Sequence, residues 1–212
     1  TLGSPDTYNH YPTGWATAFS TPFQMFKRYS QFAGGTCDPM VISWPKGIKA
    51  KGEVRHQYHH ATDVAATVLD VAGVEMPKEY KGIKQYPLNG TSMRYSFDAK
   101  DAATTRKRQY FAMLGTRGIW QDGWKAAALH APISGKGKFD QDKWELYHVE
   151  EDRSESTNLA DQNPDKLKEL IDAWFEEAKN NFVLPLDDRT AVEQLGTPRP
   201  QAEPPRDRYL YY

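Results

Sequence analysis

Lys27 is the residue whose type and setting could most directly do chemistry. It precedes the pair Gly34-Gly35, which is followed by the apolar run Met40–Trp44. A lysine ammonium is a compact point charge, and in a fixed position it stabilises negative charge that develops in a transition state. Lys27 is therefore a candidate catalytic residue. The alternative is a solvated surface lysine next to Arg28.

Aromatic and imidazole side chains near the start of the chain could form one wall of a substrate pocket. Residues 1–21 are rich in Gly, Pro, Tyr and Thr without a sustained period, which predicts an ordered or semi-ordered loop. Tyr8, His10 and Trp15 are the candidate substrate-binding residues in this loop. The alternative is that they cover the edge of the core, because such side chains are often half buried with a polar tip exposed.

No metal site is predicted from the histidines and the cysteine of this chain. His56, His59 and His60 are close in sequence, but no carboxylate at ligand spacing accompanies them, so we expect structural histidines at the entry to a helix. Cys37 is the single cysteine, which excludes an internal disulfide framework and leaves too few thiolates for a structural zinc site. We expect Cys37 to be a small core residue.

The elements that must position Lys27 are predicted from caps and apolar periodicity. The segment Ser20–Phe26, with a proline near its start, predicts a short helical turn. The run Met40–Trp44, bounded by prolines, predicts a strand buried on both faces. An amphipathic helix is predicted from Thr62 to a stop at Gly73, and a strand followed by such a helix is typical of an α/β layer fold. Its apolar residues are Val64, Ala65, Val68, Leu69, Val71 and Ala72.

From residue 109 onward the pattern changes to short strands. Four are predicted, over residues 109–114, 118–121, 124–129 and 144–149, with Asp122-Gly123 as a hairpin turn. A helix is predicted to begin at Asn163-Pro164, a cap followed by a first-position proline. The sequence therefore predicts a small antiparallel sheet packed with a C-terminal helix. The core face of that helix is formed by Leu167, Leu170, Ile171, Trp174, Phe175 and Ala178.

Composition argues against two classes of partner. The 212 residues, 39% of them apolar, can bury a substantial core. Lys plus Arg (27) nearly balances Asp plus Glu (28), so the net charge of −1 supplies no basic field for nucleic acid. A membrane span needs about 18 consecutive apolar residues, and the sequence has no such run. We predict no nucleic-acid partner and no membrane partner.

Five segments of the chain together resemble one known family. They are Lys27–Pro45, Tyr58–Val74, Leu88–Met93, Gly115–Lys125 and Trp144–Ala160. Their order, over residues 15–182, resembles the C-terminal portion of type I (formylglycine-dependent) sulfatases, in particular the bacterial-type long arylsulfatases. The resemblance implies an alkaline-phosphatase-like α/β sandwich, hydrolysis of a small-molecule sulfate ester, and Lys27 as sulfate ligand. Because the spacing to Gly34 is one residue longer than in many related sequences, Arg28 is a rival for that role.

The resemblance also implies calcium and formylglycine for the whole enzyme. The run Cys37–Pro39 begins like the Cys-x-Pro-Ser-Arg motif whose cysteine becomes formylglycine, but Met40 and Val41 stand where serine and arginine are required. Asp6 and Asn9 are isolated and do not match the paired oxygen ligands that the family supplies to calcium. We therefore expect the nucleophile and the metal ligands in the remainder of the same polypeptide, and we expect this chain alone to be inactive.

The resemblance gives a domain plan for a chain expected to be truncated at both ends. Residues 1–97 would end the catalytic α/β domain, 98–108 would be a polar linker, and 109–184 would be a C-terminal subdomain of sheet and helix. The proline-rich segment 185–212 would run extended towards a further domain. A bacterial-type enzyme of this kind is expected in the cytoplasm or the periplasm, and any address at the natural start is not visible in this sequence.

Two other functions are consistent with the sequence. A phosphatase or phosphonate monoester hydrolase of the same superfamily would share the fold and the metal chemistry. A non-catalytic binding module would use the sheet and helix of residues 109–182 to present aromatic side chains to a partner. The tryptophans available for such a surface are Trp120, Trp124, Trp144 and Trp174.

Overall fold

The structure is a computed structural model that describes residues 10–130, 137–187, 189 and 193. The chain separates into two compact units, Thr1–Asp38 with Tyr110–Tyr212, and Pro39–Gln109. Tyr8 and most of the predicted extended segment lie outside the described residues. Among the described helices, none combines the length and the apolar character needed to cross a membrane. The predicted domain boundaries refer to a longer polypeptide and stay predictions.

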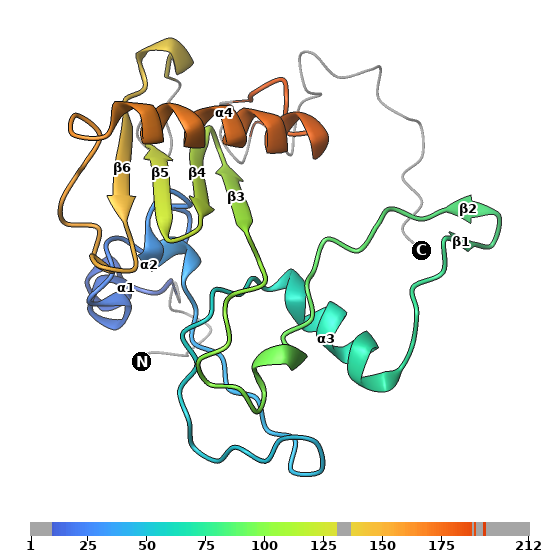
Figure 1. Ribbon diagram of the computed structural model, residues 1–212. Helices are drawn as coiled ribbons and strands as arrows, with labels where there is room; N and C mark the ends of the chain where they lie inside the picture. The colour runs from blue at the N-terminus through green and yellow to red at the C-terminus, as the bar shows by residue number, and fades with distance from the viewer. Residues whose placement is uncertain (1–9, 131–136, 188, 190–192, 194–212) are drawn as a thin grey trace, which may run out of the picture. The chain divides into compact units, whose positions relative to one another are not determined.

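A four-stranded antiparallel sheet is the centre of the first unit, as predicted. Its strands lie in the order β3 (Arg108–Met113), β4 (Thr116–Gln121), β5 (Trp124–Ala128) and β6 (Trp144–His148) (Figure 1). The β4–β5 hairpin turns at Asp122 and Gly123, which both have left-handed backbones with φ of 45° and 82°. This is the geometry that matches the twist of two paired strands, and it explains why Asp-Gly is a reliable hairpin signal.

Helix α4 (Pro164–Asn180) lies across the strands of the sheet (Figure 1), and its buried side chains are part of the core. Pro164 begins the helix, Asp165 lies in its first turn and Lys179 in its last, so both charges favour the helix dipole. Trp174 is fully buried, and its indole N–H donates to the carbonyl oxygen of Phe111 at 3.0 Å. The predicted apolar face is confirmed as core at Leu170, Trp174 and Ala178, whereas Phe175 is 38% exposed. Together with Ala173, these three residues pack against Ile119, Ala126 and Leu146 of the sheet.

The four tryptophans are used inside this unit rather than displayed. Trp120 and Trp174 are buried, and Trp124 and Trp144 are partly buried against the core. The rings of Trp144 and Trp174 meet edge to face, with centroids 6.1 Å apart. The sequence pattern that suggested a binding module therefore serves to fix a helix on a sheet.

The start of the described chain corrects the prediction of a loop over residues 1–21. Residues Thr13–Ser20 form helix α1. The rings of Trp15 and Phe19, one helical turn apart, stack with centroids at 5.8 Å, and this spacing supports a helix despite the surrounding Gly, Pro and Thr. The helix ends at Ser20, where a helical turn was predicted to begin. Beyond a turn in which the Phe23 N–H donates to the Ser20 carbonyl oxygen, the chain up to Phe26 is irregular.

The second unit contains helix α3 (Thr62–Ala72), which ends at Gly73 with a left-handed φ of 65°. The predicted helix and its stop are confirmed, but the side that packs within this unit is polar. It buries Asp63, Ala66 and Thr67, whereas Val64 and Val68 are 44% and 58% exposed.

The other elements of the second unit are short. They are the hairpin of β1 (Glu79–Tyr80) and β2 (Ile83–Lys84) and the 3-10 turn η1 (Arg94–Ser96). The prediction of a buried strand over Met40–Trp44 is wrong for this chain: the segment forms no strand, and Val41 is 93% exposed. A strand buried on both faces needs a neighbouring strand and covering layers, and within the described residues no strand pairs with it.

Candidate functional site

Lys27 lies in an exposed turn with an unusual backbone. Met25 and Arg28, on either side of it, have left-handed φ values of 61° and 89°. The turn is closed by the Tyr29 N–H donating to the Phe26 carbonyl oxygen at 3.2 Å. A non-glycine residue in the left-handed region costs about 1–2 kcal/mol. Such a turn keeps its shape only where neighbouring groups impose it.

Gly34 and Gly35 are the first of these neighbouring groups. A Cβ atom on Gly34 would lie 2.2 Å from the carbonyl oxygens of both Gln24 and Met25, and one on Gly35 would lie 2.3 Å from that of Tyr29. The Gly34 N–H donates to the Gln24 carbonyl oxygen at 3.0 Å. Only glycine allows two backbones to approach so closely, so the lysine turn and the glycine pair form one unit.

The loop after β6 supplies a second support. The Gln24 side-chain amide donates to the carbonyl oxygen of Ser154 at 3.0 Å and to that of Glu155. The Ala33 N–H donates to Glu155 Oε2 at 2.7 Å, and Lys125 Nζ on β5 donates to Glu155 Oε1 at 2.5 Å. Both ends of the lysine segment are thus attached to the same residue of the small sheet's loop.

Lys125 and Glu155 are a buried ion pair, 4% and 1% exposed. Burial lowers the pKa of the Lys125 ammonium, and this effect is larger than the opposing one of the Glu155 carboxylate. A charged pair of this kind is expensive to bury and does not by itself stabilise a fold. Sequence reasoning missed it, because the two residues are distant in sequence and a lone Lys on a predicted strand gives no signal.

Two further contacts fix the middle of the segment. The hydroxyls of Ser30 and Thr116 are hydrogen bonded at 2.7 Å in a buried setting. The buried ring of Phe32 packs against that of Tyr147 on β6, with centroids 6.5 Å apart. The segment that carries Lys27 therefore belongs to the small sheet in space.

The other predicted site residues are less constrained. His10 and Trp15 are exposed, and Trp15 packs on Phe19 within α1. Tyr8 lies outside the described residues. The pocket formed by these three residues stays a prediction. Cys37 is exposed rather than a core residue as predicted.

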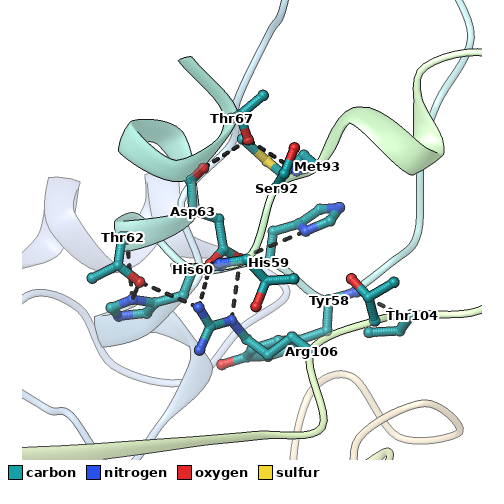
Figure 2. A network of polar contacts seen from close by, with 12 residues as sticks. Tyr58, His59, His60, Thr62, Asp63, Thr67, Ser92, Met93, Thr104 and Arg106 are labelled. Atoms are coloured by element: carbon teal, nitrogen blue, oxygen red, sulfur yellow. Dashed lines mark hydrogen bonds and ion pairs between the residues drawn. The ribbon is translucent and has the colours of Figure 1, made fainter. Parts of the chain in front are cut away.

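A polar network around Asp63 is the best-connected cluster of the second unit (Figure 2). The buried Asp63 carboxylate accepts hydrogen bonds from the N–H groups of His60 at 2.9 Å and Thr91 at 2.8 Å. Arg106, 9% exposed, donates to it from Nε at 3.1 Å and also from Nη2. Figure 2 shows His60 and Arg106 next to Asp63 in the first turn of α3. The sequence predicts the helix that begins at Thr62, but the ion pair of Asp63 with Arg106 was not predicted.

The histidines next to Asp63 belong to this network, in line with the structural role expected for them. His59 Nδ1 lies 3.7 Å from Asp63 Oδ2, and His60 Nδ1 is 3.0 Å from the Thr62 hydroxyl. Burial lowers the pKa of His59 and of His60. Across the described ranges, no three His, Cys, Asp or Glu residues come together as metal ligands. Among the described residues there is therefore no ligand cluster that fits calcium.

Comparisons with known proteins indicate one family. The model for the C-terminal region of N-sulphoglucosamine sulphohydrolase matches residues 23–125. An uncharacterized sulfatase of Schizosaccharomyces pombe is 28% identical over 94% of this chain and 35% of its own length. An N-acetylglucosamine-6-O-sulfatase of Bacteroides thetaiotaomicron is 29% identical over 66% of this chain and 25% of its own. Arylsulfatase K of Xenopus laevis is 24% identical over 69% and 27%.

Solved structures give the fold. The crystal structure of Ps i-CgsB matches 82% of this chain and 36% of its own, with a TM-score of 0.60 at 23% identity. A 6S-sulfatase of the glycosaminoglycan locus of Bacteroides thetaiotaomicron matches 72% and 31%, with a TM-score of 0.55 at 21% identity. These neighbours have the alkaline-phosphatase-like α/β fold. This chain spans between a quarter and about a third of the curated relatives that it matches. These matches indicate the sulfatase family, and they correspond to the C-terminal portion of that family's chain.

Proposed function

We propose that this chain is the C-terminal portion of a sulfatase that hydrolyses sulfate esters to an alcohol or phenol and sulfate. The observation that carries the proposal is the shape of the Lys27 turn, which lies within the region matched by the sulfatase model. Two left-handed residues, two close backbone approaches and the contacts from Glu155 all serve to fix one exposed lysine. A lysine that only contacts solvent does not require a backbone fixed in this way.

The proposed task of Lys27 is to bind the sulfate group and to stabilise the transition state. When the S–O bond of the ester breaks, negative charge gathers on the nonbridging and leaving oxygens. A fixed ammonium near these oxygens favours that charge distribution over the ground state. His10 and Trp15 are proposed to contact the rest of the substrate, as is Tyr8.

The nucleophile and the metal are proposed to come from the remainder of the same polypeptide. There a formylglycine hydrate would supply the nucleophile, and a calcium ion would supply positive charge for the sulfate group. The purified 212-residue chain, which lacks both in this proposal, is the inactive control for every rate measurement described below.

The substrate class is proposed at two levels. The sequence resemblance favours an aryl sulfate, and one relative is named as an arylsulfatase. Another relative is named for N-acetylglucosamine-6-O-sulfate, so a sulfated amino sugar is the second candidate. Rates on an aryl sulfate, on glucosamine 6-sulfate and on the matching aryl phosphate would separate these possibilities and the phosphatase alternative.

The test of the proposal is Lys27→Ala in the whole protein. Removing one group that stabilises the transition state typically costs 10²–10³-fold in rate. We expect kcat/KM for the best sulfate ester to fall by about this factor, while Lys51→Ala, at another exposed lysine, leaves it unchanged. If Arg28→Ala causes the loss instead, the role passes to Arg28. Full activity in both variants would reject a catalytic lysine turn.

A further inference from the structure

Glu155 has a backbone and a burial that packing does not explain. Its φ of 54° is left-handed, a conformation that favours glycine, yet the residue is a glutamate. Its side chain is fully buried together with that of Lys125. Backbone strain and a buried charge at one residue are both unfavourable, and such combinations concentrate at functional sites.

Every polar group of Glu155 that could face the lysine segment is in use there. Oε2 accepts from the Ala33 N–H at 2.7 Å, and the carbonyl oxygen accepts from the Gln24 side-chain amide. Oε1 is held by Lys125 Nζ at 2.5 Å, so the carboxylate cannot turn away from Ala33. Gln24 lies shortly before Lys27 and Ala33 lies just before the glycine pair. Glu155 therefore forms hydrogen bonds with the segment both before and after Lys27.

We propose that Glu155, oriented by Lys125, is a positioning residue that sets the direction of the Lys27 side chain. The proposal rests on the proposed function, because it gives Glu155 a part in the same reaction. Neither Glu155 nor Lys125 touches the substrate. The buried ion pair fixes the carboxylate, the carboxylate fixes Ala33 and Gln24, and these two fix the turn with its left-handed residues. A displaced ammonium would weaken the contact with sulfate, and displacements of about 1 Å can cost about 10²-fold in rate.

The test uses Glu155→Gln in the whole protein, with two measurements. Glutamine keeps the shape of glutamate but has no charge. The negative charge of the carboxylate attracts Lys125 and strengthens the hydrogen bond from the Ala33 N–H, so both contacts become weaker in the variant. Hydrogen exchange followed by mass spectrometry is expected to become about tenfold faster in residues 24–35 and to stay unchanged in β4 and α4. The value of kcat/KM for the sulfate ester is expected to fall about 10–100-fold.

A double-mutant cycle shows whether Glu155 acts through Lys27. If it does, Glu155→Gln costs less than about twofold in kcat/KM once Lys27→Ala is present, because the group that it positions is gone. Glu151→Gln is the matched control, since this side chain lies in the same loop and is 82% exposed. It is expected to change neither exchange nor rate.

Gln24→Ala is a second variant that leaves the buried ion pair intact. It removes only the bonds to the Ser154 and Glu155 carbonyl oxygens, and it is expected to produce both effects more weakly. If Glu155→Gln does not fold, Gln24→Ala tests whether the contacts with Glu155 fix the turn. Unchanged exchange in residues 24–35 in the variants that fold would overturn the positioning role, as would a full rate loss in the Lys27→Ala background. Full activity of Lys27→Ala itself would instead reject the proposed function of the lysine, and the exchange data would still show whether Glu155 holds the turn.

Discussion

At the scale of single residues, Asp63 shows how one carboxylate can join distant parts of a chain. It accepts hydrogen bonds from the N–H groups of His60 and Thr91 and from Arg106. Burial raises the pKa of Asp63, but the bonds from Arg106, Thr91 and His60 together outweigh burial and lower it. The folded state therefore holds the ionised form, and stability becomes dependent on pH.

Asp63→Asn is expected to lower the free energy of unfolding by about 3–5 kcal/mol at neutral pH, because it leaves the buried Arg106 without its charge partner. The pKa of Asp63 is lowered on folding, so the unfolded state binds the proton more tightly. The stabilisation is complete above the ordinary pKa of 3.8 and is lost as pH falls through the folded pKa. Denaturant unfolding from pH 7 to pH 3 should show wild type and variant converging in acid.

Asp70→Asn on the same helix is the control. Asp70 has an exposed side chain that contacts Ser92 and Arg94, and exposed pairs are worth at most about 1 kcal/mol. A constant difference between wild type and Asp63→Asn down to pH 3 would mean that the carboxylate charge is not what stabilises this network.

At the scale of elements, the backbone of the lysine turn depends on the close approach of Gly34 and Gly35. Gly34→Ala would place a methyl group 2.2 Å from two carbonyl oxygens of the turn. The backbone must move to admit it, and overpacking of this kind costs about 1–3 kcal/mol. We expect that loss in the free energy of unfolding, together with a fall of at least tenfold in kcat/KM, from urea titration and sulfate-ester kinetics on the whole protein.

Gly14→Ala is the matched control, and it is expected to raise the free energy of unfolding rather than lower it. Gly14 lies in α1 with no atom within 4 Å of the position of a new Cβ, and alanine is favoured over glycine in a helix by about 0.5–1 kcal/mol. Equal effects of the two substitutions would contradict the idea that close backbone approach is what requires glycine at residue 34.

The elements also show what local sequence can predict. The strands of the small sheet, the Asp122-Gly123 hairpin and helix α4 were predicted because their caps, turns and periodicity are all local signals. Helix α1 was missed because turn-forming residues outweighed the single Trp15–Phe19 pair. The Lys27 segment was recognised by its pattern, but its attachment to Glu155 joins residues 122 apart, and no local signal reports such a contact.

At the scale of the whole molecule, the apolar side of α3 is incomplete in this chain. Val64 and Val68 are 44% and 58% exposed, and Val41 of the predicted strand is 93% exposed. This chain spans at most 35% of the length of these curated relatives. We propose that the exposed side of α3 is covered by the part of the whole protein that corresponds to the rest of those relatives. In this proposal, the strand and helix predicted from the sequence belong to a layer whose other parts come from elsewhere in the polypeptide.

Val68→Asp tests this cover in the whole protein. A charge placed against an apolar layer is expected to lower the free energy of unfolding by at least about 2 kcal/mol, because burying a polar group without a partner is unfavourable. Thr17→Asp, at an exposed position of α1, is expected to change it by less than about 0.5 kcal/mol. Thermal and denaturant unfolding would compare the two, and a harmless Val68→Asp would show that α3 faces solvent in the complete molecule.

The hydrogen bond between Ala33 and Glu155 determines how early during synthesis the segment around Lys27 can be fixed. The two residues are 122 apart, and synthesis proceeds at about 5–20 residues per second, so the ribosome needs roughly 6–25 s to progress from one to the other. During that interval the segment around Lys27 has left the ribosome without the residue that holds it. In the proposed function, a sulfate site that uses Lys27 would therefore stay unfinished until the loop after β6 has been translated.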